Sequence, residues 1–366
     1  MKVIQVVGAR PNFMKLAPLH RAMSTTPIEQ KVIHTGQHYD AFMSDIFFEQ
    51  LQIPRPEYHL GIGSGTHSVQ TAKMMIELEV IFNQERPDWV IVFGDVNSTL
   101  AAALVCAKNG IKICHVEAGL RSYDRTMPEE INRIVTDQLS DLLLTPSIDG
   151  NQNLEKEGIN PEKVILVGNI MIDSLFWSLQ WIEKNPNSIK PALDLLNQYQ
   201  LEPQNFILVT LHRPSNVDDP IKLNKIIEAL GEISYQKPVL FPVHPRTKKI
   251  LETLSFHNYP NLHFETPLGY MDFLYLQKNS LALVTDSGGI QEETTALGIP
   301  CLTLRENTER PITITHGTNQ LIGNDFDKLK YELKEIIEGR GKKGRIPELW
   351  DGNTAKRICD IFMKML

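Results

Sequence analysis

A chain of 366 residues is longer than one hydrophobic core usually supports, so two domains are expected. Its 42% hydrophobic and 22% charged residues are ordinary for a globular enzyme. The net charge of −7 at pH 7 argues against a general binder of nucleic acid or of membrane surfaces. Any anion site must therefore be built locally from a few cations and backbone amides.

The termini and the cysteines indicate a cytoplasmic protein with no membrane partner. The first residues, MKVIQVVGARP, predict a short strand and a turn rather than a signal peptide. No apolar run approaches the roughly 18 residues that a membrane span needs. The four cysteines show no C-x-x-C spacing and fall mostly in apolar runs, which predicts buried, reduced thiols.

Short apolar runs alternate with longer segments of helical spacing along most of the chain. The runs of strand length are 2–7, 31–35, 89–94, 111–116, 141–145, 163–168, 206–211, 238–243, 261–266, 281–285 and 300–304. Segments 12–23 and 98–110 are typical of the helices between them. Strands buried on both faces that alternate with helices indicate parallel sheets built from βαβ units.

The alternation pauses at 183–191, EKNPNSIKP, which is polar, contains two prolines and predicts a linker. We therefore expect two doubly wound α/β domains with a ligand cleft between them. The expected parts are 1–182, 183–352 and a C-terminal helix at 353–366 that packs back on the first domain. This last helix is amphipathic, and Asn353 or Thr354 is the expected cap.

Polar residues follow most of the expected strands. In open parallel sheets, ligands bind beyond the carboxyl ends of the strands. The groups at these ends are Gly8-Ala9-Arg10, Gly36-Gln37, Asp95, Glu117, His212-Arg213, His244 and Asp286-Ser287-Gly288-Gly289. Their recurrence in both halves of the chain predicts a ligand cleft.

The segment that most strongly predicts a phosphate-binding site is TDSGGIQEE. In it, Ser-Gly-Gly at 287–289 precedes a helix expected to begin at Ile290 or Gln291. Glycines let backbone N–H groups approach an anion, and a helix N-terminus adds partial positive charge. A serine-capped helix after a tight turn is the alternative. Arg10 and Lys15 place two cations at another strand-to-helix turn. Neither a P-loop nor a G-x-G-x-x-G motif opens a helix, so an NTPase or dinucleotide site is not supported.

The stretch 115–133, HVEAGLRSYDRTMPEEINR, concentrates acids and arginines. Pro128 suits the first position of a helix. A surface ion pair between Glu129 and Arg133 is one interpretation. The other is that Ile131 and Val135 form the core face, which leaves Glu129 free to face a cleft. No H-E-x-x-H or G-x-S-x-G motif is present, so neither a zinc site nor a serine hydrolase is predicted.

The motifs VGARPNFMKLAP, TGQHYD, GDVNSTLAAAL, HVEAGLRS, PEEINR, LHR, VHPR, TDSGGIQEE and Thr-Glu-Arg-Pro resemble those of the non-hydrolysing UDP-N-acetylglucosamine 2-epimerases. They span nearly the whole chain, in family order. The resemblance implies two Rossmann-like domains in a glycosyltransferase-B arrangement, with the UDP-sugar between them. It also implies a homodimer and no metal or nicotinamide cofactor.

The implied reaction interconverts UDP-GlcNAc and UDP-ManNAc through anti elimination of UDP to 2-acetamidoglucal and re-addition with inversion at C2. Glu129 is preferred to Glu130 because it is the first Glu of its motif. The resemblance implies acid–base roles for Asp95, Glu117 and Glu129, with His212 on the leaving phosphate. It implies that the diphosphate, ribose, uracil and sugar are bound by Arg10, Lys15, Phe273, Ser287, Gly288, Gly289, Glu293 and Arg310.

Several residues depart from the family pattern, and other activities compete. Leu268 stands where a glutamine is common, and Ile312 where a glutamate is common. The segments 35–51 and 61–67 also resemble the UDP-2,3-diacetamido-2,3-dideoxyglucuronate 2-epimerases. A hydrolysing epimerase, a glycosyltransferase and a non-catalytic nucleotide-sugar binder are the remaining alternatives. The glycosyltransferase is disfavoured because Thr285 interrupts its Glu-x7-Glu motif, and the binder because it would need none of the three acids.

Overall fold

The computed structural model describes residues 1–37, 51–53, 55–254 and 257–366. It divides into unit 1, Met1–Ser174 with Glu348–Leu366, and unit 2, Leu175–Pro347. Most of segment 35–51, which resembles the diacetamido-uronate branch, lies outside the described residues. The same holds for the side chain of Arg10, although its backbone begins the first helix.

Unit 1 is built on a seven-stranded sheet in the order β3-β2-β1-β4-β5-β6-β7, and its paired strands are parallel. Its strands are β1 (Lys2–Val7), β2 (Glu29–His34), β3 (Tyr58–His59), β4 (Trp89–Phe93), β5 (Lys112–Val116), β6 (Leu142–Thr145) and β7 (Val164–Leu166). The central strands are buried on both faces, as a parallel sheet requires.

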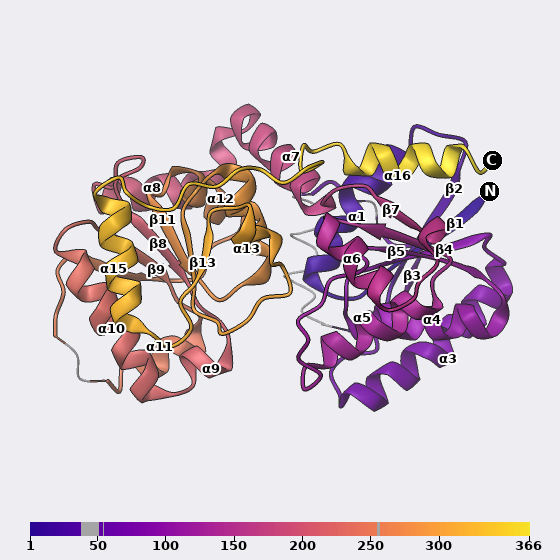
Figure 1. Cartoon of the computed structure of the whole chain (residues 1–366), viewed down its shortest axis with the longest axis horizontal. Coiled ribbons are helices and arrows are strands. Elements are labelled where there is room, and N and C mark those ends of the chain that lie inside the picture. The colour runs from indigo at the N-terminus through magenta and orange to yellow at the C-terminus, as the bar shows by residue number, and fades with distance from the viewer. Residues whose placement is uncertain (38–50, 54, 255–256) are drawn as a thin grey trace. The chain divides into compact units, whose positions relative to one another are not determined.

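Helices cover both faces of this sheet (Figure 1). They are α1 (Arg10–Met23), α3 (His67–Glu85), α4 (Asn97–Asn109), α5 (Pro128–Leu139), α6 (Ile148–Lys156), η1 (Pro161–Lys163) and α16 (Thr354–Met363). One apolar cluster joins β1 and β4 to α3 and α4. On the other face α16 lies against α1, and Phe362 meets the ring of Trp89 edge-on at 5.6 Å.

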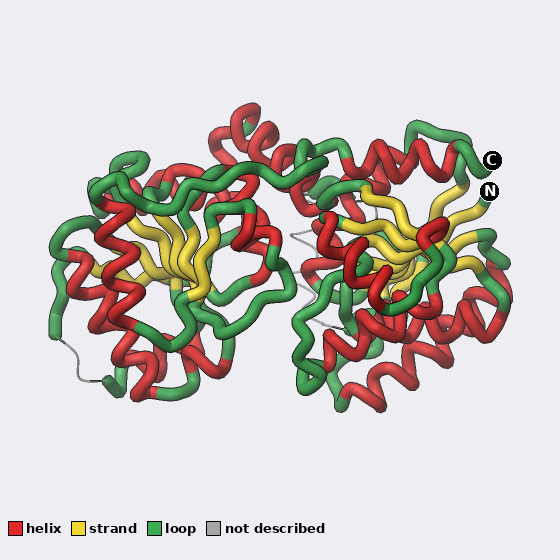
Figure 2. Tube along the Cα trace, viewed as in Figure 1, coloured by secondary structure: helices red, strands yellow, loops and turns green. Residues whose placement is uncertain are grey.

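Unit 2 holds a six-stranded sheet in the order β10-β9-β8-β11-β12-β13, again with parallel pairs (Figure 2). Its strands are β8 (Ile207–Thr210), β9 (Val239–Pro242), β10 (Leu262–Glu265), β11 (Ala282–Thr285), β12 (Cys301–Thr303) and β13 (Asn319–Leu321). Its helices are α8 (Lys190–Gln198), α9 (Pro214–Val217), α10 (Pro220–Ser234), α11 (Pro245–Leu251), α12 (Tyr270–Asn279), α13 (Gly288–Leu297), α14 (Ile312–Thr315) and α15 (Phe326–Ile337).

The segment at the start of unit 2 is helical, so the expected linker at 183–191 is wrong. Helix α7 (Ile170–Lys184) runs through the expected boundary at 182/183, and a 3-10 turn, η2 (Pro186–Ile189), leads directly into α8. Prolines at the first turns of η2 and α8 suit helix starts, where their missing N–H is not needed. The same residues that suggested a linker therefore begin helices.

Every strand expected from an apolar run occurs, and the fold class is confirmed. The strands β3 and β13 were not expected. They have two and three residues, and each lies at one edge of its sheet. Unlike the similarly short β7 and β12, they do not lie in an apolar run, which explains why they were not expected. The four cysteines are buried and free, as predicted.

Hydrogen bonds to a side chain of α7 hold the start of the C-terminal helix α16 within unit 1. The carboxylate of Asp173 accepts hydrogen bonds from the backbone N–H groups of Thr354 at 3.1 Å and Ala355 at 2.7 Å. Asn353 occupies the cap position, but its side chain makes no capping hydrogen bond. The expected cap is therefore replaced by a distant carboxylate, which satisfies the same free N–H groups.

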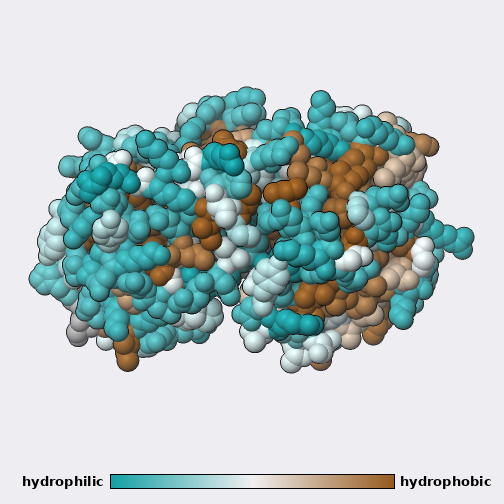
Figure 3. All heavy atoms as spheres, viewed as in Figure 1, coloured by the Kyte–Doolittle hydropathy of each residue, from teal (hydrophilic) through white to brown (hydrophobic). Residues whose placement is uncertain are grey.

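The surface of unit 1 drawn in Figure 3 shows hydrophobic patches between hydrophilic side chains, whereas the drawn face of unit 2 is mostly hydrophilic. Within the described ranges, no helix has the length and apolar character needed to cross a membrane.

Candidate active site

Two acids and a lysine meet at the carboxyl edge of the unit 1 sheet. Asp95 and Glu117 follow the neighbouring strands β4 and β5. The ammonium group of Lys15, from α1, forms an ion pair with Glu117, and the two side chains are only 6% and 5% exposed. A Cβ atom on Gly94 would lie 2.6 Å from Lys15 Nζ and 2.8 Å from Glu117 Oε2, so this pair lies directly over the residue before Asp95.

Glu117 is held in an unusual backbone conformation. Its φ of 75° lies in the left-handed region that non-glycine residues seldom adopt. The N–H groups of Glu117 and Ala118 both donate to the carbonyl oxygen of Leu144, at 3.1 Å each. Strained residues held by their surroundings are common at functional sites. The direction of this carboxylate is therefore set by the fold.

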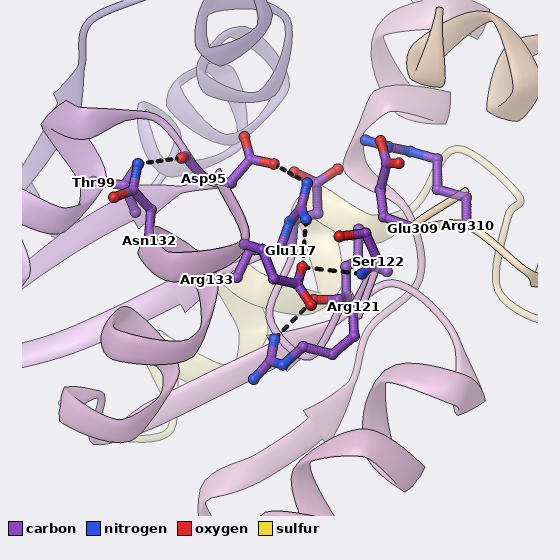
Figure 4. Close-up of polar contacts among 12 residues, drawn as sticks. Asp95, Thr99, Glu117, Arg121, Ser122, Asn132, Arg133, Glu309 and Arg310 are labelled. Atoms are coloured by element: carbon purple, nitrogen blue, oxygen red, sulfur yellow. Dashed lines mark hydrogen bonds and ion pairs between the residues drawn. The ribbon is translucent and has the colours of Figure 1, made fainter. Parts of the chain in front are cut away.

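Arg133 of α5 joins Asp95 to a third acid, Glu130 (Figure 4). One of its Nη atoms pairs with the carboxylate of Asp95, and the other lies 2.7 Å from Glu130 Oε2. Glu130 also accepts hydrogen bonds from the N–H groups of Ser122 at 2.9 Å and Tyr123 at 2.8 Å. Asp95 is thus oriented by a buried cation, while Glu130 is fully engaged and only 1% exposed.

Helix α5 begins at Pro128, as predicted, but its expected core face is wrong. Ile131 is 36% exposed and Val135 is only partly buried. The buried residues of α5 are Glu130, Asn132, Arg133, Thr136 and Asp137. The helix packs a polar face toward the site because the atoms opposite it are carboxylates, carbonyls and amides that need partners.

A cavity of about 240 Å³ opens beside these groups, within unit 1. Asp95 and Glu129 both line it, together with neutral polar side chains that include Gln70, Asn97 and Asn132. Asn132 donates to the carbonyl oxygen of Asp95 at 2.8 Å, and Asn97 donates to Gln70 Oε1 at 2.9 Å. Glu129 therefore faces a space that can hold a ligand.

In unit 2, His212 follows β8 and is oriented by Asp286, which follows β11. Asp286 Oδ1 lies 2.8 Å from His212 Nδ1, and its carboxylate accepts the N–H groups of His212 and Arg213 and the side-chain amide of Asn216. Burial raises the pKa of Asp286, but these contacts outweigh it and hold the pKa below its ordinary value.

The His212 side chain is 62% exposed, so the ring is fixed at Nδ1 and accessible elsewhere. Nδ1 must carry a proton to donate to the carboxylate, which leaves Nε2 facing outward to meet a ligand. The sequence placed Asp286 among the polar groups at strand ends, because it directly follows an apolar strand, but assigned it no role. Its pairing with His212 could not be predicted from the sequence.

The Ser-Gly-Gly segment forms the start of α13, which begins at Gly288 rather than at the expected Ile290 or Gln291. The glycines thus supply the first two N–H groups of the helix themselves. Ser287 is the cap residue, but its side chain makes no capping hydrogen bond. A Cβ atom on Gly288 would lie 2.7 Å from Arg310 Nη1, so the guanidinium group packs against this turn.

Carboxylates hold Arg310 in place. Its Nε lies 2.9 Å from Glu292 Oε1, and its Nη1 pairs with Glu309. Glu293 is 3% exposed and accepts a hydrogen bond from the hydroxyl of Tyr270 at 3.1 Å. Phe273 is partly buried on α12.

Within the described ranges, no group of three or more His, Cys, Asp or Glu side chains is arranged to hold a metal ion.

Comparison with known proteins identifies the family. The family model of UDP-N-acetylglucosamine 2-epimerase matches residues 21–363. The enzyme of that name from Methanocaldococcus jannaschii is 43% identical over 99% of this chain and 98% of its own length. The chain belongs to the UDP-N-acetylglucosamine 2-epimerase family. The resemblance inferred from the motifs is therefore confirmed.

Solved structures agree with this family assignment. The crystal structure of the Methanocaldococcus jannaschii epimerase in complex with UDP-GlcNAc and UDP aligns with a TM-score of 0.86 at 41% identity, covering 100% of both chains. The Neisseria meningitidis epimerase bound to UDP-GlcNAc aligns with a TM-score of 0.88 at 31% identity, also over 100% of both chains. The UDP-2,3-diacetamido-2,3-dideoxy-D-glucuronate 2-epimerase of Pseudomonas aeruginosa is 42% identical over 100% of both chains. Epimerases of the family thus act on more than one sugar.

Proposed function

We propose that this protein interconverts UDP-GlcNAc and UDP-ManNAc by a non-hydrolysing inversion at C2. Membership of the epimerase family supports the reaction class. The observation that carries the proposal to the level of residues is the grouping of three acids at one edge of unit 1. Glu117 is fixed beside Gly94, and Asp95 and Glu129 line one cavity.

The proposed reaction balances without an oxidant or reductant. The C2 proton of the sugar is not acidic, so its removal must accompany the departure of UDP. One group takes the proton while the bond from C1 to the UDP oxygen breaks, which leaves 2-acetamidoglucal and UDP. UDP then adds back to C1 while a second group delivers a proton to the opposite face of C2. Carboxyl groups with suitable pKa values can serve both tasks.

We assign the acid–base roles to Asp95, Glu117 and Glu129. The choice of Glu129 is supported by its place in the cavity lining. Glu130 is buried and accepts hydrogen bonds from Arg133 and from two backbone amides, which suits a structural role. The ion pair and the strained backbone of Glu117 support a fixed carboxylate that cannot turn away from the sugar.

The proposed UDP site lies in unit 2. The N-terminus of α13 and the exposed ring of His212 support it, because both can meet phosphate oxygens. His212 would contact the phosphate that leaves. The other proposed UDP-sugar contacts are Arg10, Lys15, Phe273, Ser287, Gly288, Gly289, Glu293 and Arg310.

A second substrate deserves a test because of the identity to the Pseudomonas aeruginosa enzyme. UDP-2,3-diacetamido-2,3-dideoxyglucuronate undergoes the same inversion but carries an acetamido group at C3 and a carboxylate at C6. Incubation with each UDP-sugar in turn, followed by separation of the epimers by chromatography, measures the preference. A kcat/KM that favours the uronate would replace UDP-GlcNAc as the substrate and leave the acid–base assignment standing.

The residue assignment is tested with Asp95→Asn and Glu117→Gln. Both variants should lose turnover of UDP-GlcNAc, because each removes an acid–base group while keeping the side-chain shape. Both should still bind UDP in calorimetry, because most of the proposed UDP contacts, including His212 and the start of α13, lie in unit 2. Near-normal turnover in the two variants would contradict the assignment.

A homodimer in the cytoplasm stays a prediction from the resemblance. The described part of α3 offers one supporting observation. Val69, Ile76 and Val80 are 49%, 64% and 61% exposed and share one face of this helix. Exposed apolar stripes often mark contacts with another protein. Light scattering on the wild type and on Ile76→Asp tests this stripe, and an unchanged dimer in the variant would exclude it.

A further inference from the structure

A buried histidine–aspartate pair lies between the two loops that carry Asp95 and Glu117. His115 belongs to β5 and Asp137 to α5, and both side chains are 0% exposed. His115 Nδ1 lies 2.6 Å from Asp137 Oδ1. His115 Nε2 lies 2.8 Å from the carbonyl oxygen of Gly94. Neither side chain lines the cavity, so the pair is separate from the proposed acid–base groups.

The hydrogen bonds fix the roles of both side chains. The carbonyl oxygen of Gly94 can only accept, so His115 Nε2 carries a proton. The second oxygen of Asp137 accepts the N–H of Gly119 at 3.1 Å and pairs with Arg121 at 2.7 Å, as an ionised carboxylate would. Burial raises the pKa of Asp137, but His115 and Arg121 outweigh it and hold the pKa below its ordinary value. His115 therefore donates from both nitrogens.

These contacts reach both loops through their backbones. Gly94 directly precedes Asp95, and Gly119 follows Glu117 by two positions. The loop that carries Glu117 adopts a conformation that needs outside support. Glu117 has a φ of 75°, and Gly119 has a φ of 81° with no room for a Cβ atom, which would lie 2.5 Å from the carbonyl oxygen of Gly150. His115 and Asp137 thus give each loop one hydrogen bond and join the two loops through a single pair.

Stability alone does not account for a buried ionic pair at this place. Replacing such a pair by apolar side chains of similar volume is often neutral or stabilising. An apolar pair, however, could not bind the carbonyl of Gly94 and the N–H of Gly119. What the ionic pair adds is a fixed position for these two backbone groups.

We propose that His115 and Asp137 are positioning residues, which hold the backbones of the Asp95 and Glu117 loops at the separation that the C2 inversion requires. This inference rests on the proposed function, because that function assigns the acid–base work to Asp95 and Glu117. The pair itself does not touch the sugar. Its effect is transmitted through Gly94 and Gly119.

The expected signature is a loss of kcat without a loss of binding. Displacing a reacting group by about 1 Å can lower the rate about 10²-fold. His115→Gln keeps a donor for the carbonyl oxygen of Gly94 but loses the ring nitrogen that faces Asp137, and Asp137→Asn removes the charge. Both variants should lower kcat about 10²-fold while KM for UDP-GlcNAc and the affinity for UDP stay close to the wild type.

Two further variants separate positioning from general destabilisation. The double variant His115→Phe/Asp137→Leu replaces the pair by apolar groups. Arg121 keeps its ion pair with Glu157 at 2.7 Å, so the variant should fold but show the same loss of kcat. Asp141→Asn is the matched control. Asp141 accepts the N–H of Ile113 at 3.0 Å near the other end of β5, and it bonds to neither loop. Its kcat should equal that of the wild type.

The outcomes are read from kcat, KM, UDP affinity and Tm measured on all variants together. Low kcat with near-wild-type UDP affinity in variants that the thermal melt shows to be folded supports the proposal, and if the single variants do not fold, the double variant decides. Wild-type kcat in the folded variants overturns it, as does an equal loss in Asp141→Asn. The wild type is assayed in parallel with UDP-GlcNAc, so that a failure of the proposed function can be told from a failure of the positioning role. An inactive wild type contradicts the proposed function, whereas an active wild type with active variants contradicts only the positioning role.

Discussion

The ammonium group of Lys15 pairs with the carboxylate of Glu117 in a place where water hardly reaches either group. The sequence suggested that Lys15 binds the diphosphate, and this remains a prediction. In the structure the lysine places its ammonium group against this buried glutamate and holds the carboxylate in position. A carboxylate that is fixed and poorly solvated is suited to act as a base.

Removing this cation should destabilise the protein strongly. Lys15→Met removes the cation that pairs with the buried Glu117, and breaking a buried pair costs about 3–5 kcal/mol. Urea unfolding measures the loss in free energy of unfolding. The double variant Lys15→Met/Glu117→Gln should recover part of this loss, because it removes both charges.

A surface pair provides the control for this prediction. Lys330 pairs with Glu232 at 3.2 Å, and the glutamate side chain is 54% exposed. Lys330→Met should cost about 0–1 kcal/mol, as exposed pairs usually do. Similar small losses for both lysines would show that the pair of Lys15 and Glu117 is not buried in solution.

The adjacent glutamates of α5 should separate catalysis from stability. Glu129→Gln should lower turnover at least about 10²-fold with little change in Tm, because it removes a proposed acid–base group that lines a cavity. Glu130→Gln should lower the free energy of unfolding by about 1–3 kcal/mol, because it disturbs buried hydrogen bonds to Arg133, Ser122 and Tyr123. Turnover assays and thermal melts of both variants test this, and the reverse pattern would assign catalysis to Glu130.

The two glycines that begin α13 should respond differently to alanine. A Cβ atom on Gly288 would press on Arg310, which two glutamates hold, so Gly288→Ala should cost about 1–3 kcal/mol. A Cβ atom on Gly289 meets no protein atom within 4 Å, so Gly289→Ala should gain about 0.4–1 kcal/mol. Denaturant unfolding of both variants measures the difference.

Gly289→Ala also tests the proposed phosphate site. Glycine allows a ligand to approach the backbone closely, so the added methyl group should weaken UDP binding despite the intact fold. Calorimetry with UDP measures this effect. Wild-type affinity in Gly289→Ala would place the phosphates away from this turn.

The cap of α16 should make stability depend on pH. Burial raises the pKa of Asp173 to about 6, from an ordinary value of 3.8, despite hydrogen bonds from Ala355 and Thr354. The native state thus holds this proton more tightly than the unfolded state does. The stability contribution is fully present below about pH 3.8 and is lost as the pH rises through about 6.

Asp173→Asn removes this titration. The stability of the wild type relative to the variant should therefore fall by about 2 kcal/mol between about pH 4 and pH 7. Chemical unfolding of both proteins across this range measures the difference between their free energies of unfolding at each pH. The contributions of the other titrating groups are common to both proteins and cancel in this difference. A difference that is constant, or that rises with pH, would contradict the raised pKa.

The sequence was sufficient to predict most of the strands and the edge where the acids lie. Apolar runs mark buried parallel strands, and side chains that follow such strands meet at one edge of the sheet, which placed Asp95 and Glu117. The same reasoning failed for α5. Ile131 and Val135 suggested a core face, yet this helix buries polar residues, because its neighbours are the polar groups of the site.

Pairs of residues that are distant in the chain could not be predicted. His212 and Asp286 are separated by 74 positions, and Thr354 and Asp173 by 181. A single sequence shows which residues are polar but not which of them meet. The His115–Asp137 pair was missed for this reason, since each residue by itself is an ordinary side chain of a strand or helix.

Proton NMR of the wild type with UDP-GlcNAc in deuterated water tests the central claim most directly. Removal of the C2 proton and delivery from solvent at the opposite face predict UDP-ManNAc that carries deuterium at C2. Product that retains the original proton at C2 would contradict the proposed elimination and re-addition by Asp95, Glu117 and Glu129. Release of free ManNAc with UDP would contradict the non-hydrolysing course.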